Sequence, residues 1–207
     1  MELDPEVHAH APKVGHRAID LALTLSVLAL SVGSIIIAIQ NEANMQRLVT
    51  ANSWPYIETI HGNEKNGQAI IHFDVRNAGI GPATLEKLVV RYNGQTVRSG
   101  RELLQRCCAI GGSLDAIRRV SINMVENRVL PAREEITFLA VSKSDVSTDM
   151  WERLDVERLK VDMDACYSSV FGEHWTTSLR NPRPVRVKSC DALPGSAYEG
   201  NLADVSP

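Results

Sequence analysis

Four cysteines offer the clearest chemistry in this chain of 207 residues. Cys166 and Cys190 flank a predicted hairpin, and a disulfide between them would close a loop of about 24 residues, worth roughly 3 kcal/mol in loop entropy. Cys107 and Cys108 are adjacent, so they could form a vicinal disulfide, remain as buried thiols or pair with the other two cysteines. We take Cys166 and Cys190 as the disulfide candidate, on the condition that the domain lies outside the cytoplasm.

The other reactive side chains show no spacing that marks a site. A set of Cys107, Cys108, Cys166 and His174 lacks the Cys-x-x-Cys or closely spaced His pair of a zinc site. No nucleophile elbow, glycine-rich phosphate loop or pair of catalytic acids is recognisable. The net charge of −3 argues against nucleic-acid binding, which normally requires a basic surface. We therefore expect no catalytic residue, no metal, no cofactor and no enzymatic activity.

An apolar run near the N-terminus bears on the compartment in which these residues lie. Residues 21–39 read LALTLSVLALSVGSIIIAI and carry no charge. A helix of that length extends roughly 28 Å, close to the thickness of the hydrocarbon core of a bilayer. The run is longer than the apolar part of a cleaved signal peptide, which is usually about 7–15 residues. The pattern predicts a transmembrane helix over residues 19–40 that is retained as a signal-anchor.

The charges beside this run set the expected orientation. Lys13 and Arg17 precede it, whereas Arg47 is the one basic residue close behind it. The positive-inside rule then favours a cytoplasmic N-terminal segment, residues 1–18, with the rest of the chain on the extracytoplasmic side. The expected partners are the lipid bilayer and either another membrane protein or a second copy of the chain.

Small residues at four-residue spacings give the predicted span a way to contact another helix. Such spacing lets two helices approach closely, although the same residue types are common in membrane helices in general. The packing candidates are Ala22, Ser26, Ala29, Gly33, Ser34 and Ala38.

Strand patterns dominate the chain beyond the span. We expect a helical stalk over residues 41–54, ended by Pro55, and then a domain over residues 55–180. Alternating apolar residues and the Asn-Gly turn at residues 93–94 indicate about seven or eight strands. These strands are expected at residues 56–60, 69–76, 85–92, 95–98, 118–125, 135–141, 159–167 and 175–179. With short helices at residues 101–108 and after Ser147, the pattern favours a mainly β fold, an immunoglobulin-like β-sandwich with one or two helical insertions.

A Pro-rich basic segment and a tail occupy residues 181–207. We expect the tail to be loose, because it is rich in small and polar residues. The basic side chains could contact an acidic partner or anionic lipid headgroups, or belong to a solvated connector. They are Arg180, Arg183, Arg186 and Lys188.

A short motif directly follows one predicted strand. Residues 77–83 read Asn-Ala-Gly-Ile-Gly-Pro-Ala. Gly79 and Gly81 permit positive φ, Pro82 fixes the exit and Asn77 can bond back to the turn, so the motif builds a structural loop. Together with the span, the stalk and the Trp-Pro pair, the motif resembles a broad group of uncharacterised bacterial single-span membrane proteins. The resemblance implies an extracytoplasmic β-sandwich anchored in the inner membrane, and it implies no activity.

Three kinds of function are compatible with these features. An interaction module, acting as an accessory or scaffold subunit of a membrane assembly, agrees best with a span, a stalk and a domain without a recognisable site. A sensor that binds a ligand or an envelope component would need a pocket with convergent polar groups. An enzyme with an unfamiliar site is the remaining alternative.

Overall fold

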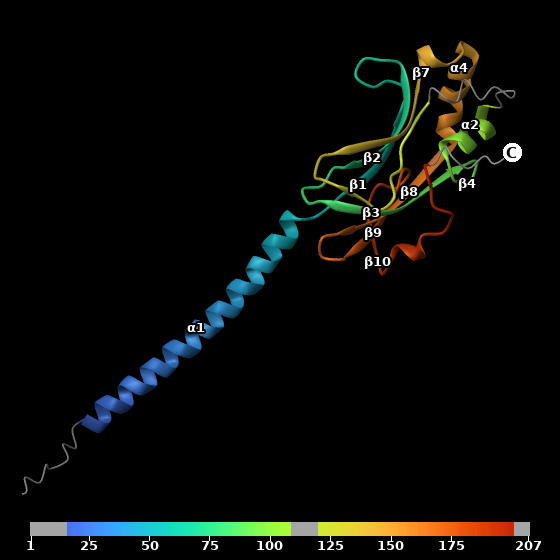
Figure 1. Cartoon of the computed structure of the whole chain (residues 1–207). Helices are drawn as coiled ribbons and strands as arrows, with labels where there is room; N and C mark the ends of the chain where they lie inside the picture. The colour runs from blue at the N-terminus through green and yellow to red at the C-terminus, as the bar shows by residue number, and fades with distance from the viewer. Residues whose placement is uncertain (1–15, 109–119, 201–207) are drawn as a thin grey trace, which may run out of the picture. The chain divides into compact units, whose positions relative to one another are not determined.

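The long N-terminal helix is one of two compact units. The computed structural model describes residues 16–108 and 120–200, and its contacts separate a unit ending at Val49 from one beginning at Thr50. Helix α1 (His16–Asn52) makes up the described part of the first unit, and its last three residues belong to the second (Figure 1). It is long and apolar enough to cross a membrane, which confirms the predicted N-terminal helix. Its serine hydroxyls donate to carbonyls of their own helix, as Ser34 Oγ does to Leu30 O at 2.8 Å.

The second unit is built from two antiparallel sheets (Figure 1). The first sheet has the strand order β1-β2-β7-β5. Its strands are β1 (Ile57–Gly62), β2 (Ile70–Asn77), β7 (Glu135–Ser142) and β5 (Ser121–Ile122). The strand expected over residues 118–125 is therefore only a short edge strand at residues 121–122, and residues 118–119 lie outside the described residues.

The second sheet has the order β10-β9-β8-β3-β4, and β6 pairs with the start of β3. Its strands are β3 (Ala83–Tyr92), β4 (Gln95–Val97), β6 (Arg128–Leu130), β8 (Val161–Ser169), β9 (His174–Ser178) and β10 (Val185–Val187). Asn93 and Gly94 join β3 to β4 with φ of 49° and 78°, the positive values that a type I′ turn requires. The prediction of a mainly β remainder is confirmed.

One hydrophobic core lies between the sheets. Phe73 of β2 and Phe138 of β7 contribute from the first sheet, and Leu88 of β3 and Ala165 of β8 contribute from the second. The aromatic rings of Phe73 and Phe138 have centroids 6.1 Å apart. Adjacent residues on a strand point to opposite faces, so the alternation of apolar residues along β2, β3 and β8 directs one face of each strand into this core.

Two α-helices close one side of the core. They are α2 (Gly100–Cys108) and α4 (Thr148–Glu157), and the short 3-10 helices are η1 (Lys143–Asp145), η2 (Arg158–Lys160) and η3 (Cys190–Ala192). Ser147 caps α4 by accepting from Met150 N at 3.4 Å. Met150, Trp151 and Leu154 are buried on one face, as the spacing of the sequence predicts for a helix packed on a core.

The expectation of a loose C-terminal tail is wrong for the described part of that segment. Residues 188–200, which we call the C-terminal strap, pack on the second sheet. Lys87 Nζ donates to Leu193 O at 2.7 Å and Tyr198 N donates to Leu88 O at 2.8 Å. Tyr198 is fully buried, with its ring centroid 4.9 Å from that of Phe138. The burial of this ring removes apolar surface from water and so favours order in a segment whose composition alone indicates a coil. Residues 201–207 lie outside the described residues.

Candidate functional site

A buried polar network is the first arrangement of side chains that could take part in chemistry. Asp74 lies on the face of β2 opposite to Phe73, and its side chain is 1% exposed. Lys65, in the loop between β1 and β2, donates from Nζ to Asp74 Oδ2 at 3.0 Å, to Glu135 Oε1 at 2.6 Å and to Thr137 Oγ1 at 2.5 Å. A buried carboxylate with such a partner is stabilised by charge-assisted hydrogen bonds. The network therefore holds the loop against the outer face of the first sheet.

His72 belongs to the same network. Its Nδ1 lies 2.7 Å from Asp74 Oδ2, and its Nε2 lies 3.2 Å from Glu64 O. Both partners are acceptors, so both contacts are hydrogen bonds only when the two ring nitrogens carry protons. Both ring nitrogens of His72 therefore lie against groups of the protein, one in the network and one in the loop.

His61 is a second histidine beside the network, with the opposite electrostatic environment. Arg158 Nη1 donates to His61 Nδ1 across 2.9 Å, an arrangement that requires the neutral ring. Burial lowers the pKa of His61 below its ordinary value, and the charges of Arg158 and His72 lower it further. Among the described residues, no group of three or more His, Cys, Asp or Glu side chains could hold a metal ion. The hydrogen bonds of Lys65 and His72 join the loop between β1 and β2 to strands β2 and β7.

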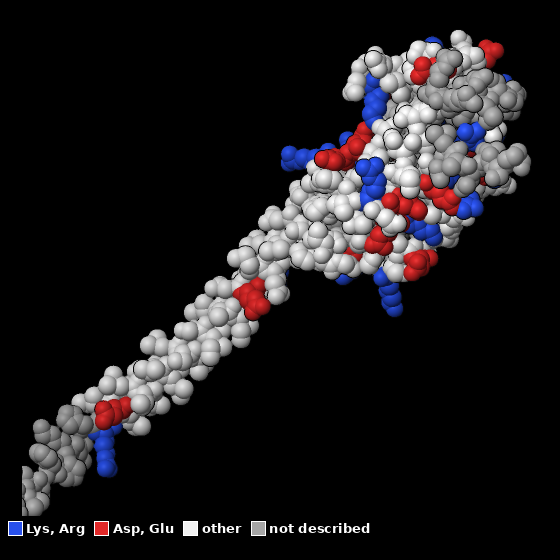
Figure 2. All heavy atoms as spheres, viewed as in Figure 1, with Lys and Arg blue, Asp and Glu red and all other residues white. Residues whose placement is uncertain are grey.

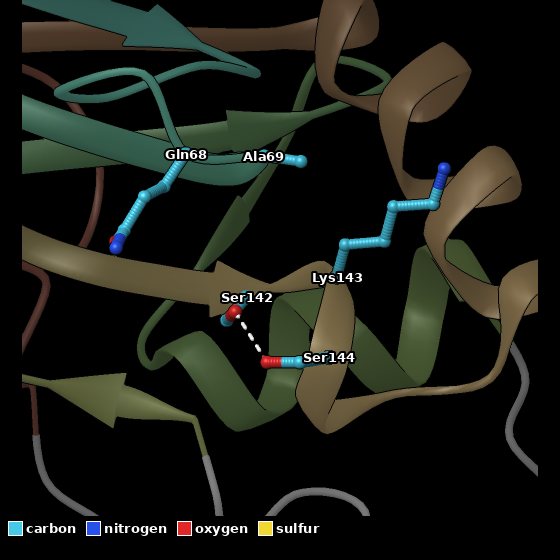
Figure 3. A pocket seen from close by; sticks show the side chains of 5 residues that line it. All are labelled: Gln68, Ala69, Ser142, Lys143 and Ser144. Atoms are coloured by element: carbon cyan, nitrogen blue, oxygen red, sulfur yellow. Dashed lines mark hydrogen bonds between the residues drawn. The ribbon is translucent and has the colours of Figure 1, made fainter.

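Two of the shallow hollows on the surface of the domain are lined by described residues. One of about 410 Å³ lies where β2 begins and β7 ends, lined by Gln68, Ala69, Ser142, Lys143 and Ser144. Figure 3 shows the Ser142 and Ser144 hydroxyls bonded to each other, at 2.9 Å, while the Lys143 side chain points away from them. The other, of about 220 Å³, includes Asp164, Thr176 and Arg183. Because polar groups do not converge in the first hollow, it offers little to orient a small ligand.

A group of large apolar side chains is exposed at one end of the sandwich. Trp54 is 49% exposed, Ile80 54%, Val170 63% and Phe171 51%. We call these four residues the apolar end. Strand register places all four at the same end of the domain. Trp54 precedes β1, which starts opposite the last residue of β2, and Ile80 lies between β2 and β3. Val170 and Phe171 follow β8, whose end pairs with the start of β3. Several large apolar side chains exposed at one end of a domain mark an interaction site more often than an isolated exposed residue does.

The motif at residues 77–83 builds this end. Asn77 is fully buried, and its amide donates to Gly81 O at 2.8 Å and to Leu130 O at 3.0 Å while accepting from Gly79 N at 3.0 Å. The backbone N–H groups of Ile80 and Gly81 both donate to Trp54 O. Asn77 therefore does fix the loop from within.

The two glycines of the motif have a different role from the one expected. Gly79 and Gly81 are not among the described glycines with positive φ. Instead, a Cβ on Gly79 would lie 2.5 Å from Trp54 O, and one on Gly81 would lie 1.9 Å from Ser53 O. Glycine is required because the chain entering the domain passes directly over the loop, so the prediction that these glycines supply positive φ is wrong. Pro82 follows the loop and leads into β3.

Two of the four basic residues of the C-terminal basic segment are paired with carboxylates. Arg180 pairs with Asp162 of β8, and Arg186 pairs with Glu173 at 2.7 Å. Arg183 and Lys188 are both exposed. Figure 2 shows acidic and basic side chains interspersed over the visible face of the domain. A surface of mixed charge gives little attraction to a polyanion, so this segment is a weaker candidate for partner contact than the apolar end.

All four cysteines are in disulfides. Cys166 is joined to Cys190, which fastens the C-terminal strap to the outer face of β8, where Val89 and Leu193 pack around the bond. Cys107 and Cys108 form a vicinal disulfide at the end of α2. Of the alternatives open for this pair, the structure therefore has the vicinal bond.

The small residues of α1 named above all lie on its surface, with Gly33 half-buried and the others exposed.

The comparisons with known proteins add no relative. No family model matches the chain, and no match was found among curated proteins or among solved structures.

The apolar end is the functional candidate that sequence reasoning missed. Trp54 and the Asn-x-Gly-x-Gly-Pro-Ala motif are visible in the sequence, but the adjacency of residues 54, 80 and 170–171 arises only from the pairing of β1 with β2 and of β3 with β8.

Proposed function

We propose that this chain is a single-pass membrane protein whose extracytoplasmic domain binds another membrane protein, as an accessory or scaffold subunit of an assembly. The apolar end is the observation that carries the proposal. It lies at the end of the domain where the chain enters from α1, because the backbone of Trp54 directly follows that helix. This end of the domain is therefore the one that the chain joins directly to the anchor, and a membrane protein is the partner that we propose for it.

The strand order supports an immunoglobulin-like architecture for the domain. With β1, β2, β3, β5, β7, β8 and β9 taken as strands A to G, the sheets β1-β2-β7-β5 and β9-β8-β3 correspond to the ABED and GFC sheets of a constant-type domain. Strands β4, β6 and β10 are additions to the second sheet. The disulfide lies outside the core, unlike the inter-sheet bond of antibody domains. Domains of this architecture often act through surface contacts, which agrees with the proposed role.

Placement in a bacterial inner membrane, with the N-terminus in the cytoplasm, is part of the proposal. The apolar length of α1 supports a membrane anchor, and Lys13 and Arg17 before the apolar run support the orientation. Two disulfides support an oxidising compartment for the domain. The resemblance of residues 77–83 to a bacterial group supports the membrane assigned.

The test uses two valines with the same exposure at different places. Val170 of the apolar end is 63% exposed and Val156 of α4 is 61% exposed. In the full chain, extracted in mild detergent and purified, Val170→Asp should reduce the co-purifying partner about tenfold, because a charge would be buried in the contact. Val156→Asp should leave it unchanged. Migration of the wild-type chain without any partner, or equal loss in both variants, would contradict the proposal.

A ligand-binding role has one observation in its favour, the hollow beside Ser142 and Ser144. If the domain captured an envelope component there, Ser142→Ala together with Ser144→Ala would abolish the binding while Val170→Asp would not. The same two sets of variants therefore separate the interaction module from the ligand sensor.

A further inference from the structure

The vicinal disulfide of Cys107 and Cys108 lacks the feature by which a disulfide stabilises a fold. It joins two neighbours at the end of α2, so it closes no loop and connects no second element. The bond between Cys166 and Cys190 instead joins residues 24 apart and fastens the C-terminal strap to β8. The domain therefore carries one disulfide that supports the fold and one for which loop closure gives no structural reason.

Folding protects the two bonds from reduction to different extents. A disulfide that stabilises the folded chain is stabilised by folding to the same extent, because the coupling is reciprocal. Loop closure over 24 residues gives the bond between Cys166 and Cys190 a factor of about a hundred in this equilibrium, and it gives the vicinal bond none. Adjacent Cα atoms lie about 3.8 Å apart, closer than the roughly 4.4–6.8 Å that disulfides usually span, and such a departure makes a bond easier to reduce. The vicinal bond is therefore the more reducible of the two.

The two bonds also differ in their access to solvent. Cys166 is fully buried and Cys190 is 7% exposed, inside a small apolar cluster. Cys107 is half-buried, whereas Cys108 is 3% exposed and belongs to the core. A thiolate that approaches the vicinal bond from solvent therefore reaches the sulfur of Cys107, which makes Cys108 the residue whose sulfur leaves.

A positive charge lies beside the residue with the leaving sulfur. Arg153 of α4 donates from Nη1 to Cys108 O at 3.3 Å. A guanidinium beside a cysteine favours the thiolate form of that cysteine. Arg153 is therefore placed to assist the departure of the Cys108 sulfur when the bond is attacked.

We propose that the bond between Cys107 and Cys108 is a thiol–disulfide exchange site, which accepts electrons from the dithiol of an extracytoplasmic oxidoreductase. One thiolate of that dithiol attacks Cys107 Sγ and forms a mixed disulfide, and Cys108 Sγ leaves as a thiolate that takes up a proton. The second thiol of the dithiol attacks its own half of the mixed disulfide and releases Cys107 as a thiol. Two electrons and two protons thereby pass from the dithiol to the vicinal pair, and the structure shows the oxidised state of the site.

A redox titration of the full chain in mild detergent tests the difference between the two bonds. The protein is equilibrated with mixtures of reduced and oxidised dithiothreitol, and free thiols are then blocked with N-ethylmaleimide and assigned by mass spectrometry of peptides. Half-reduction of the vicinal bond should require a ratio of reduced to oxidised dithiothreitol about a hundredfold lower than half-reduction of Cys166 and Cys190 does. Reduction of both bonds at the same ratio, or of Cys166 and Cys190 first, would overturn the proposal.

Trapping with a thioredoxin variant tests the exchange step itself. A thioredoxin whose second active-site cysteine is replaced by serine cannot complete the exchange, so it stays joined to the sulfur that it attacks. It should be trapped on Cys107, as mass spectrometry of the linked peptides would show. Trapping mainly on Cys108, or on the pair Cys166 and Cys190, would overturn the proposal.

The rate of trapping tests the role of Arg153. Arg153→Gln should slow it about threefold or more by removing the charge, and Arg153→Lys should stay close to the wild-type rate. Arg128→Gln is the matched control, because Arg128 Nη1 likewise donates to a backbone carbonyl, Met124 O, at 3.4 Å. Equal rates in all four proteins would overturn the assignment of Cys108 as the leaving residue. These experiments do not involve the proposed membrane partner, so loss of that partner's binding would reject the proposed function and leave the exchange site standing.

Discussion

Asn77 shows how one buried amide organises the apolar end. Its two amide hydrogens and its carbonyl oxygen meet Gly81 O, Leu130 O, Gly79 N and Tyr56 N. Leaving any of these buried groups without a partner would cost about 1–3 kcal/mol. The sequence predicts the bond back to the turn, because asparagine after a strand commonly makes it. The contacts with Leu130 and Tyr56 depend on tertiary pairing, so no local pattern indicates them.

His61 is a single residue whose titration we expect to make the stability of the folded protein depend on pH. Its pKa in the folded protein is lowered from 6.5 by burial, by Arg158 and by His72. The unfolded chain therefore binds more protons below pH of about 6.5, and the stability linked to His61 is present above that pH and is lost as pH falls through the folded pKa. Thermal unfolding of the full chain should show a steeper loss between pH 7.5 and 5 than His61→Gln shows.

The choice of glutamine makes this comparison specific. A glutamine side-chain carbonyl can accept from Arg158 as the neutral imidazole does, but it does not titrate. The other five histidines of the chain are common to both proteins, so the difference between the two pH profiles reports the titration of His61 together with its coupling to His72. Parallel profiles would show that His61 titrates alike in the folded and unfolded chains.

At the scale of elements, the long strands are readable from the sequence and the short ones are not. Alternating apolar residues identify β2, β3 and β8, because each has one face in the core. Strand β6 has three residues and exposes two of them, so no alternation marks it. The C-terminal strap is similar: its buried hydrophobic residues Cys190, Leu193 and Tyr198 are unevenly spaced, so they give no periodic signal.

The two disulfides should differ in what they contribute to the stability of these elements. Cys166 and Cys190 are 24 residues apart in sequence, whereas Cys107 and Cys108 are adjacent. By the entropy of loop closure, removing the first bond with Cys166→Ala and Cys190→Ala should cost about 3 kcal/mol of unfolding free energy. Removing the second with Cys107→Ala and Cys108→Ala should cost about 1 kcal/mol or less, since that bond closes no loop.

Denaturant unfolding of both double variants, monitored by tryptophan fluorescence, measures the difference. The Cys107 and Cys108 pair is the internal control for loss of the small buried sulfur surface, because Cys108 is 3% exposed and Cys166 is fully buried. Equal costs for the two pairs would mean that the strap is held by Tyr198 and its hydrogen bonds, with little contribution from its disulfide.

At the scale of the whole molecule, the proposed orientation in the membrane determines whether the domain lies in an oxidising or a reducing compartment. The bias that predicts it is small, since Lys13 and Arg17 oppose Arg47 alone. The disulfides give independent support, because such bonds persist outside the reducing cytoplasm. Orientation is therefore the property of the chain that a direct measurement can sharpen most.

Thiol labelling in spheroplasts makes that measurement. Glu152 is exposed on α4, and Glu152→Cys should react with a membrane-impermeant maleimide while the inner membrane is intact. Ala11→Cys, before the apolar run, should react only after permeabilisation. The wild-type chain should stay unlabelled under both conditions because its cysteines are in disulfides. Labelling of the wild-type domain only after permeabilisation would place it in the cytoplasm with reduced thiols, and it would reject both the orientation and the extracytoplasmic role built on it.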